Sequence, residues 1–225
     1  MNGQAILFGA IGTLVETSDM QRRAFNLAFV AEGLDWYWDA RTYAEMLQTA
    51  GGAARIADFA ESLGESVDAD AVHETKVALF AEMIKRNGLQ LRPGVKETIE
   101  AAKRSGVPVG FVTATGQAQV DAIFAALGDQ LSRDDFAYIG DASQVNRSKP
   151  APDIYLAALQ SLGVDASDAI AIEDSVPSAN SAIAAGIMTY VTPGQMHRGA
   201  AFPAEAIVIQ RPGFDLLGQQ RIAAE

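Results

Sequence analysis

Several polar residues are of types that bind anions or metal ions, and they occur at comparable places in the chain. Each follows a stretch typical of a buried strand or precedes the next helix: Thr13, Thr113 with Thr115, Lys149, and Glu173 with Asp174. Two adjacent carboxylates repel each other unless a cation or a basic group offsets their charge. A hydroxyl, a solvated lysine or an acidic helix N-cap is ordinary when it occurs alone. Their combination predicts a site that holds an anion, a metal ion or both.

A parallel sheet would bring these residues together. The apolar run 5–8, closed by Gly9, is typical of a buried parallel strand. From Gly88 onward strands alternate with helices, as expected for a sheet with crossover connections. Strands are predicted at 107–113, 136–139, 169–172, 188–191 and 207–209, and helices at 95–105, 120–127, 154–162, 177–185 and 215–224. Because ligands bind outside the carboxyl ends of such strands, the polar residues are expected to line one crevice.

The segment between the first strand and Gly88 has a different pattern. Apolar periodicity and turn residues predict only helices there, at 18–32, 40–47, 53–63 and 68–85, with Ser18 or Asp19 as the first N-cap. The predicted fold is therefore α/β: a doubly wound parallel sheet with an all-helical cap inserted after the first strand. The predicted domains are a core of residues 1–15 and 88–225 and a cap of residues 16–87. A cap at that place can exclude water and select a substrate.

Composition excludes several classes of function. With 28 acidic and 17 basic residues and a net charge of -11, the chain lacks the basic surface that nucleic acids require. Cysteine is absent, which excludes thiolate chemistry, and His73 and His197 lack the spacing of metal ligands. No apolar run approaches the roughly 20 residues that span a bilayer, and no leader pattern precedes the first strand. We therefore expect a soluble cytoplasmic protein that does not bind membranes; the sequence does not indicate its oligomeric state.

Four segments carry a resemblance to a known family. ILFGAIGTLVET, FVTAT, SKPAPDIY and AIEDSVPSANSAIAAG resemble, in order, the four motifs of the haloacid dehalogenase-like superfamily. They are most similar to its branch of sugar-phosphate phosphatases with a helical cap. Within the predicted cap, RRAFN, DWYWD and TAGGAARIA resemble the subgroup named CbbY, whose characterised activity is dephosphorylation of xylulose-1,5-bisphosphate. This resemblance implies a Rossmann-like core, a magnesium-dependent phosphatase ancestry and a small phosphorylated ligand.

The resemblance also implies a role for individual residues. The first family motif reads Asp-x-Asp-Gly-Thr, where the first aspartate becomes an aspartyl-phosphate and the second acts as acid and base. In this sequence the corresponding positions are Gly9 and Ile11, which supply neither the nucleophile nor the proton shuttle of the family. The remaining assignments are phosphate binding by Thr13, Thr113 and Lys149, substrate or cap contacts by Glu16, Arg23, Tyr43, Gly52 and Arg55, and metal binding by Asp174 with Glu173 and the Ile11 carbonyl. The lysine that the family carries in the cap is replaced by Ala53.

These substitutions leave three alternatives open. The first is a catalytically impaired or inactive homologue that binds a sugar phosphate, a sugar bisphosphate or inorganic phosphate. The second is an active phosphatase in which water attacks directly with the help of Lys149, Asp174 and a metal. The third is a protein-interaction role with a vestigial pocket. Magnesium is expected to bind weakly or not at all, because it usually needs carboxylates that position 9 no longer supplies. Lys149, Thr113 and the backbone N–H groups after Gly9 are then expected to hold an anion without metal.

Overall fold

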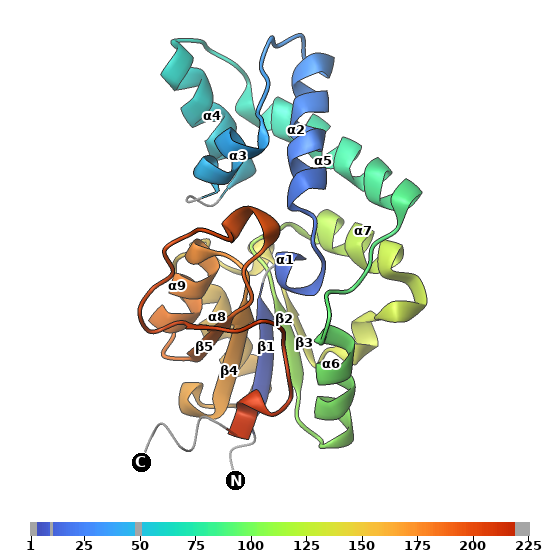
Figure 1. Cartoon of the computed structure of the whole chain (residues 1–225), viewed down its shortest axis with the longest axis vertical. Coiled ribbons are helices and arrows are strands. Elements are labelled where there is room, and N and C mark those ends of the chain that lie inside the picture. The colour runs from blue at the N-terminus through green and yellow to red at the C-terminus, as the bar shows by residue number, and fades with distance from the viewer. Residues whose placement is uncertain (1–3, 10, 48–50, 219–225) are drawn as a thin grey trace.

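A parallel sheet forms the centre of the protein in the computed structural model, which describes residues 4–9, 11–47 and 51–218 (Figure 1). Its six described strands lie in the order β3-β2-β1-β4-β5-β6. They are β1 (Ala5–Gly9), β2 (Val109–Val112), β3 (Tyr138–Gly140), β4 (Ala169–Glu173), β5 (Met188–Val191) and β6 (Ile207–Val208). Phe8 of β1 is in register with Phe111 on one side and Ile172 on the other. The chain thus builds outward from β1 in both directions, which confirms the doubly wound α/β prediction.

Helices cover both faces of the sheet, which explains why its central strands β1 and β2 are apolar throughout. The four are α6 (Val95–Arg104), α7 (Gln117–Leu127), α8 (Asp153–Leu162) and α9 (Val176–Ala184). Side chains of β1 alternate between the two faces. Ile6 and Phe8 pack in the cluster that contains residues of α6 and α7, whereas Leu7 packs in the cluster with residues of α8 and α9.

The segment between β1 and α6 is helical and stands over the carboxyl ends of the strands (Figure 1). After the short helix α1 (Ile11–Leu14) it contains α2 (Ser18–Ala31), α3 (Ala40–Met46), α4 (Gly52–Leu63) and α5 (Ala69–Asn87). Its own core is aromatic: Phe25 and Phe29 lie 4.9 and 4.7 Å from the Trp38 ring, measured between ring centroids. The division into core and cap domains stays a prediction that agrees with this arrangement.

Some predicted boundaries were wrong. Helix α2 begins at Ser18, so neither Ser18 nor Asp19 is its N-cap; Thr17 occupies that position without a side-chain cap, and Glu16 accepts the Ser18 N–H at 2.9 Å. Strand β2 is shorter than 107–113, and β3 begins later than predicted. Most of the helix predicted at 215–224 lies outside the described residues. Within the described part of the chain, none of the helices has the length and apolar character needed to span a membrane.

Candidate functional site

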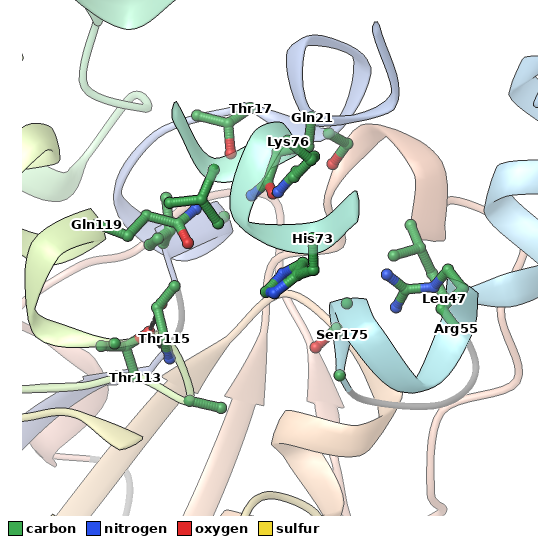
Figure 2. Close-up of a pocket in the computed structure, with 18 of the residues that line it drawn as sticks. Thr17, Gln21, Leu47, Arg55, His73, Lys76, Thr113, Thr115, Gln119 and Ser175 are labelled. Carbon is green, nitrogen blue, oxygen red and sulfur yellow. Dashed lines mark hydrogen bonds between the residues drawn. The ribbon is translucent and has the colours of Figure 1, made fainter. Parts of the chain in front are cut away.

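A cavity of about 520 Å³ lies between the helical segment and the carboxyl ends of the strands. Its upper wall includes residues of α2, α4 and α5, among them Phe25, Arg55, His73 and Lys76. Its lower wall comes from the segments that follow β2 and β4. In Figure 2, His73 and Arg55 point into the space above Thr113, Thr115 and Ser175. The cavity therefore lies at the edge of the sheet where the sequence predicted a crevice.

The upper wall is cationic. Arg55 and Lys76 are buried, with 8% and 3% of their surface exposed, and both line the cavity. The Arg55 guanidinium carbon lies 5.6 Å from the centroid of the Tyr43 ring, and its Nε donates to the Met46 carbonyl at 3.2 Å. Aromatic faces and carbonyl oxygens therefore hold this cation in place without removing its charge. Among the described residues that line the cavity, Asp174 is the one acid.

Lys76 is the most perturbed of these cations. Its Nζ lies 4.7 Å from the centroid of the Phe25 ring and 5.2 Å from that of Phe80, and it donates to the Gln21 side-chain oxygen. Burial, reinforced by the charge of Arg55, lowers the Lys76 pKa to about 7. An anion in the cavity would reverse this effect, because an opposite charge favours the ammonium form. Burial also lowers the pKa of His73, and the positive charges of Lys76 and Arg55 lower it further.

Asp174 and two threonines form the floor. Thr113 and Thr115 share a short hydrogen bond between their hydroxyl groups, and the Thr113 N–H donates to the Gly140 carbonyl at 2.9 Å. Asp174 follows β4 and is 6% exposed. Burial raises its pKa to about 6, an effect that the positive charges of Lys149 and Arg92 partly oppose. Its Oδ1 has no hydrogen-bond partner among the described residues, so one carboxylate oxygen remains available.

Lys149 and Glu173 form a buried ion pair beneath this floor. Lys149 Nζ donates to Glu173 Oε1 at 2.7 Å and to the Val112 carbonyl at 3.1 Å, and the Tyr155 hydroxyl also donates to Glu173 Oε1. Lys149 is 3% exposed and Glu173 is fully buried, and neither lines the cavity. Burial raises the pKa of Glu173, although Lys149 opposes that shift. The lysine that the resemblance assigns to phosphate is thus already paired with a carboxylate of the same chain.

The carboxylate of Glu173 also occupies the space of a side chain at position 9. A Cβ placed on Gly9 would lie 1.9 Å from Glu173 Oε1 and 2.0 Å from its carboxyl carbon. Ordinary van der Waals contact between such atoms needs 3.4 Å or more. Gly9 and the observed position of Glu173 are therefore mutually dependent.

Other predicted residues lie in different surroundings. Tyr43 and Gly52 line the cavity, and Gly52 lets His73 approach so closely that a Cβ there would lie 2.2 Å from its Nε2. Glu16 accepts the Gln195 N–H at 2.6 Å and thereby ties the start of α2 to the segment after β5. Arg23 is exposed, and neither it nor Thr13 is among the described lining residues. Ile11 lines the cavity with an apolar side chain that also belongs to the core. Their predicted roles stay predictions.

Three titratable lining residues were not predicted from the sequence. Lys76 lies on the buried stripe of α5 formed by Val72, Phe80 and Ile84 at four-residue intervals. A lysine on such a stripe was the available signal. His73 and His197 are far apart in sequence, yet both line the cavity. Burial lowers the His197 pKa, and its Nδ1 has no partner within the described chain. No sequence pattern links these two histidines, because the fold alone brings them together.

The donor set does not fit a resident magnesium ion. Glu173 Oε2 and Asp174 Oδ1 are buried and have no hydrogen-bond partners in the described ranges, so each offers one oxygen. However, the Lys149 ammonium on the other Glu173 oxygen would repel a dication, and Gly9 has no side-chain oxygen. No group of three or more histidine, cysteine, aspartate or glutamate residues converges in residues 4–9, 11–47 and 51–218. We therefore assign no chemical step to a metal.

The fold and the cavity define a Rossmann-like α/β protein with a pocket under a helical segment, in which two buried basic residues line the upper wall. The chain belongs to the haloacid dehalogenase-like hydrolase family, whose model matches residues 4–186. It is 41% identical over 208 residues to protein CbbY of Rhodobacter capsulatus, covering 91% of each chain. It is 40% identical over 218 residues to the plasmid protein CbbY of Cupriavidus necator, covering 93% of this chain and 86% of that one.

Two solved structures are similar over almost the whole chain. One is a CbbY variant from Rhodobacter sphaeroides in complex with xylulose-(1,5)bisphosphate, with a TM-score of 0.85 and 35% identity, covering 94% of this chain and 95% of that one. The other is CbbY from the same organism in complex with phosphate, with the same TM-score and identity, covering 97% of each chain. The chain is thus a CbbY-like member of its family.

Proposed function

We propose that this protein binds a phosphorylated sugar in the cavity but does not hydrolyse it by way of an aspartyl-phosphate. The observation that carries the proposal is a buried cationic wall in the cavity, combined with the absence of a side chain at position 9. Arg55 and Lys76 supply positive charge inside the cavity, whereas Gly9 supplies no atom that can attack phosphorus. The CbbY structures in complex with phosphate and xylulose-(1,5)bisphosphate support this class of ligand.

Binding would rest on residues of both walls. The Arg55 guanidinium can donate two parallel hydrogen bonds to a phosphate, and Lys76 can add a third charge-assisted bond. The shared hydroxyl pair of Thr113 and Thr115 faces the cavity from below and suits a sugar hydroxyl. Because Arg55 and Lys76 are already desolvated, a phosphate would gain a stronger interaction than it would at an exposed surface.

Turnover by the family route would lack both of its reacting groups. Nucleophile and acid–base residue act as a unit, so losing both removes most of the rate enhancement that either supports. Ile11 offers an apolar side chain at the second position. The carboxylate nearest to position 9 belongs to Glu173, which is fully buried and bonded to Lys149 and Tyr155.

A second function is favoured by one observation at the floor. Asp174 lines the cavity with an unpartnered carboxylate oxygen, which is the arrangement of a general base that activates water. Direct attack of that water on a bound phosphate ester would release inorganic phosphate without a covalent intermediate. This alternative requires turnover that Asp174→Asn abolishes.

Calorimetry combined with a phosphate-release assay tests the proposal. Xylulose 5-phosphate is titrated into the protein, and the same mixture is assayed for inorganic phosphate with and without magnesium. We expect heat of binding, its loss in Arg55→Ala with Lys76→Met, and no phosphate release. Release that depends on Asp174 would favour the second function. Absence of binding to any sugar phosphate or to inorganic phosphate would leave the third alternative, an interaction role with a vestigial pocket.

A further inference from the structure

The proposed function leaves open how many phosphate groups the site can hold. The cavity places two cationic residues, Arg55 and Lys76, in its upper wall. The other cation near the strand ends that the sequence assigned to phosphate is Lys149, which lies below the floor and does not line the cavity. Lys149 therefore differs from Arg55 and Lys76, because it lies below the floor and is already paired with the Glu173 carboxylate.

The Glu173 carboxylate offsets the charge of Lys149 and accepts its hydrogen bond, as a bound anion would. Its Oε1 accepts a hydrogen bond from Lys149 Nζ at 2.7 Å and another from the Tyr155 hydroxyl. The side chains of this pair are 1% and 0% exposed. To reach Lys149, a phosphate would have to displace the buried Glu173 carboxylate or lie beside it. Two anions side by side repel each other strongly in a medium of low dielectric constant.

The absence of a side chain at position 9 makes this arrangement possible. The Glu173 carboxyl carbon lies 2.0 Å from the point where a Cβ of residue 9 would stand. Any larger residue would force the carboxylate away from this point. Glycine at position 9 thus has two consequences: it supplies no nucleophile, and it lets Glu173 settle beside Lys149.

We infer that Glu173 closes the lower phosphate subsite from within, so that the protein holds a sugar phosphate through one phosphate group and gains no affinity from a second. The inference rests on the proposed function, because it concerns the ligand of the same cavity. The single phosphate is held by Arg55 and Lys76 in the upper wall. The sugar then extends toward Thr113 and Thr115 on the floor.

Calorimetric titration with a matched pair of ligands tests this inference. Xylulose 5-phosphate and xylulose 1,5-bisphosphate share one carbon chain and differ by one phosphate. In the wild-type protein we expect dissociation constants within about threefold of each other. A second phosphate bonded to a lysine would instead contribute about 1.5–3 kcal/mol, which is on the order of 10- to 100-fold in affinity.

A variant that opens the subsite provides the matched comparison. Glu173→Ala frees Lys149 and removes the competing charge, so we expect the preference for the bisphosphate to rise at least about tenfold. Glu173→Ala combined with Lys149→Met has the same space but no cation, and is expected to show no such rise. If Glu173→Ala does not fold, Glu173→Gln removes the charge at constant size and is expected to raise the preference by a smaller factor.

Each result bears on a different statement. A wild-type protein that binds the bisphosphate more than tenfold more tightly overturns the closed subsite but leaves the proposed function standing. A wild-type protein that binds neither ligand, with a Glu173→Ala variant that binds the bisphosphate, overturns the proposed function and supports the closed subsite. Absence of binding to every variant overturns both.

Discussion

The dependence between Gly9 and Glu173 can be tested by adding one methyl group. In Gly9→Ala the new Cβ would lie 1.9 Å from Glu173 Oε1, about 1.5 Å closer than contact allows. The carboxylate is the end of a flexible side chain, but Lys149 and Tyr155 hold it in a buried position. The methyl group must therefore weaken those bonds or strain the strand.

The expected cost follows from these contacts. Overpacking a filled interior costs about 1–3 kcal/mol, and breaking a buried ion pair fully costs about 3–5 kcal/mol. Partial displacement of the carboxylate, offset by roughly 0.5–1 kcal/mol for replacing glycine in a strand, gives a net loss of about 2–3 kcal/mol. For a chain of this size that corresponds to a decrease in Tm of about 5–10 °C.

A double-mutant cycle separates this mechanism from a general sensitivity of β1. Unfolding is followed by circular dichroism for wild type, Gly9→Ala, Glu173→Ala and the double variant. We expect Gly9→Ala to be neutral or slightly stabilising when Glu173 is Ala, so that the coupling free energy is about 2–3 kcal/mol. Gly199→Ala is the control, because a Cβ there meets nothing within 4 Å. An equal effect of Gly9→Ala in both backgrounds would refute the reasoning.

Three further predictions concern the ligand, the acid and the lost motif. Burial lowers the Lys76 pKa to about 7, so the ammonium loses its proton between pH 6 and pH 8.5. Calorimetry with sulfate, whose own charge is constant in this range, should therefore show binding about tenfold weaker at pH 8.5 than at pH 6. A pH dependence in wild type no larger than that in Lys76→Met would contradict this. Burial raises the Asp174 pKa from 3.8 to about 6, so the folded protein keeps a proton that the unfolded chain releases between about pH 4 and 6, and stability falls as pH rises through that window. The free energy of unfolding of Asp174→Asn should therefore exceed that of wild type by up to about 3 kcal/mol at pH 7.5 and match it near pH 4. Urea unfolding with a chelator present measures both values, and a difference that stays constant with pH would exclude this linkage. Gly9→Asp with Ile11→Asp should restore magnesium-dependent phosphate release while either single change does not, and an inactive but folded double variant would show that the cap or Glu173 prevents recovery.

The sequence predicted the architecture well because apolar runs and turn residues determine it locally. The run 5–8 and its closing Gly9 indicated the central strand, and alternation after Gly88 indicated the parallel sheet. Boundaries were less accurate where side-chain hydrogen bonds decide them. Ser18 was expected to cap α2, but the Glu16 carboxylate accepts its N–H and the helix begins at Ser18 itself.

The cavity could be predicted only in part. Thr113 and Asp174 follow strands directly, so topology alone places them at the cavity. Lys76 was not predicted, because apolar periodicity does not single out a lysine that lies on the buried side of a helix. The pairing of Lys149 with Glu173 could not be inferred, since it depends on space that opens only when Gly9 packs against β4.

The central claim, that the protein holds a sugar phosphate without transferring its phosphoryl group, is tested most directly by phosphorus NMR. Xylulose 5-phosphate is mixed with an equal amount of protein, magnesium is added, and the spectrum is followed for hours. We expect the ester resonance to broaden or shift on binding and no inorganic phosphate to appear. Growth of the inorganic phosphate resonance beyond the rate without protein would contradict it, as would an ester resonance that the protein leaves unchanged.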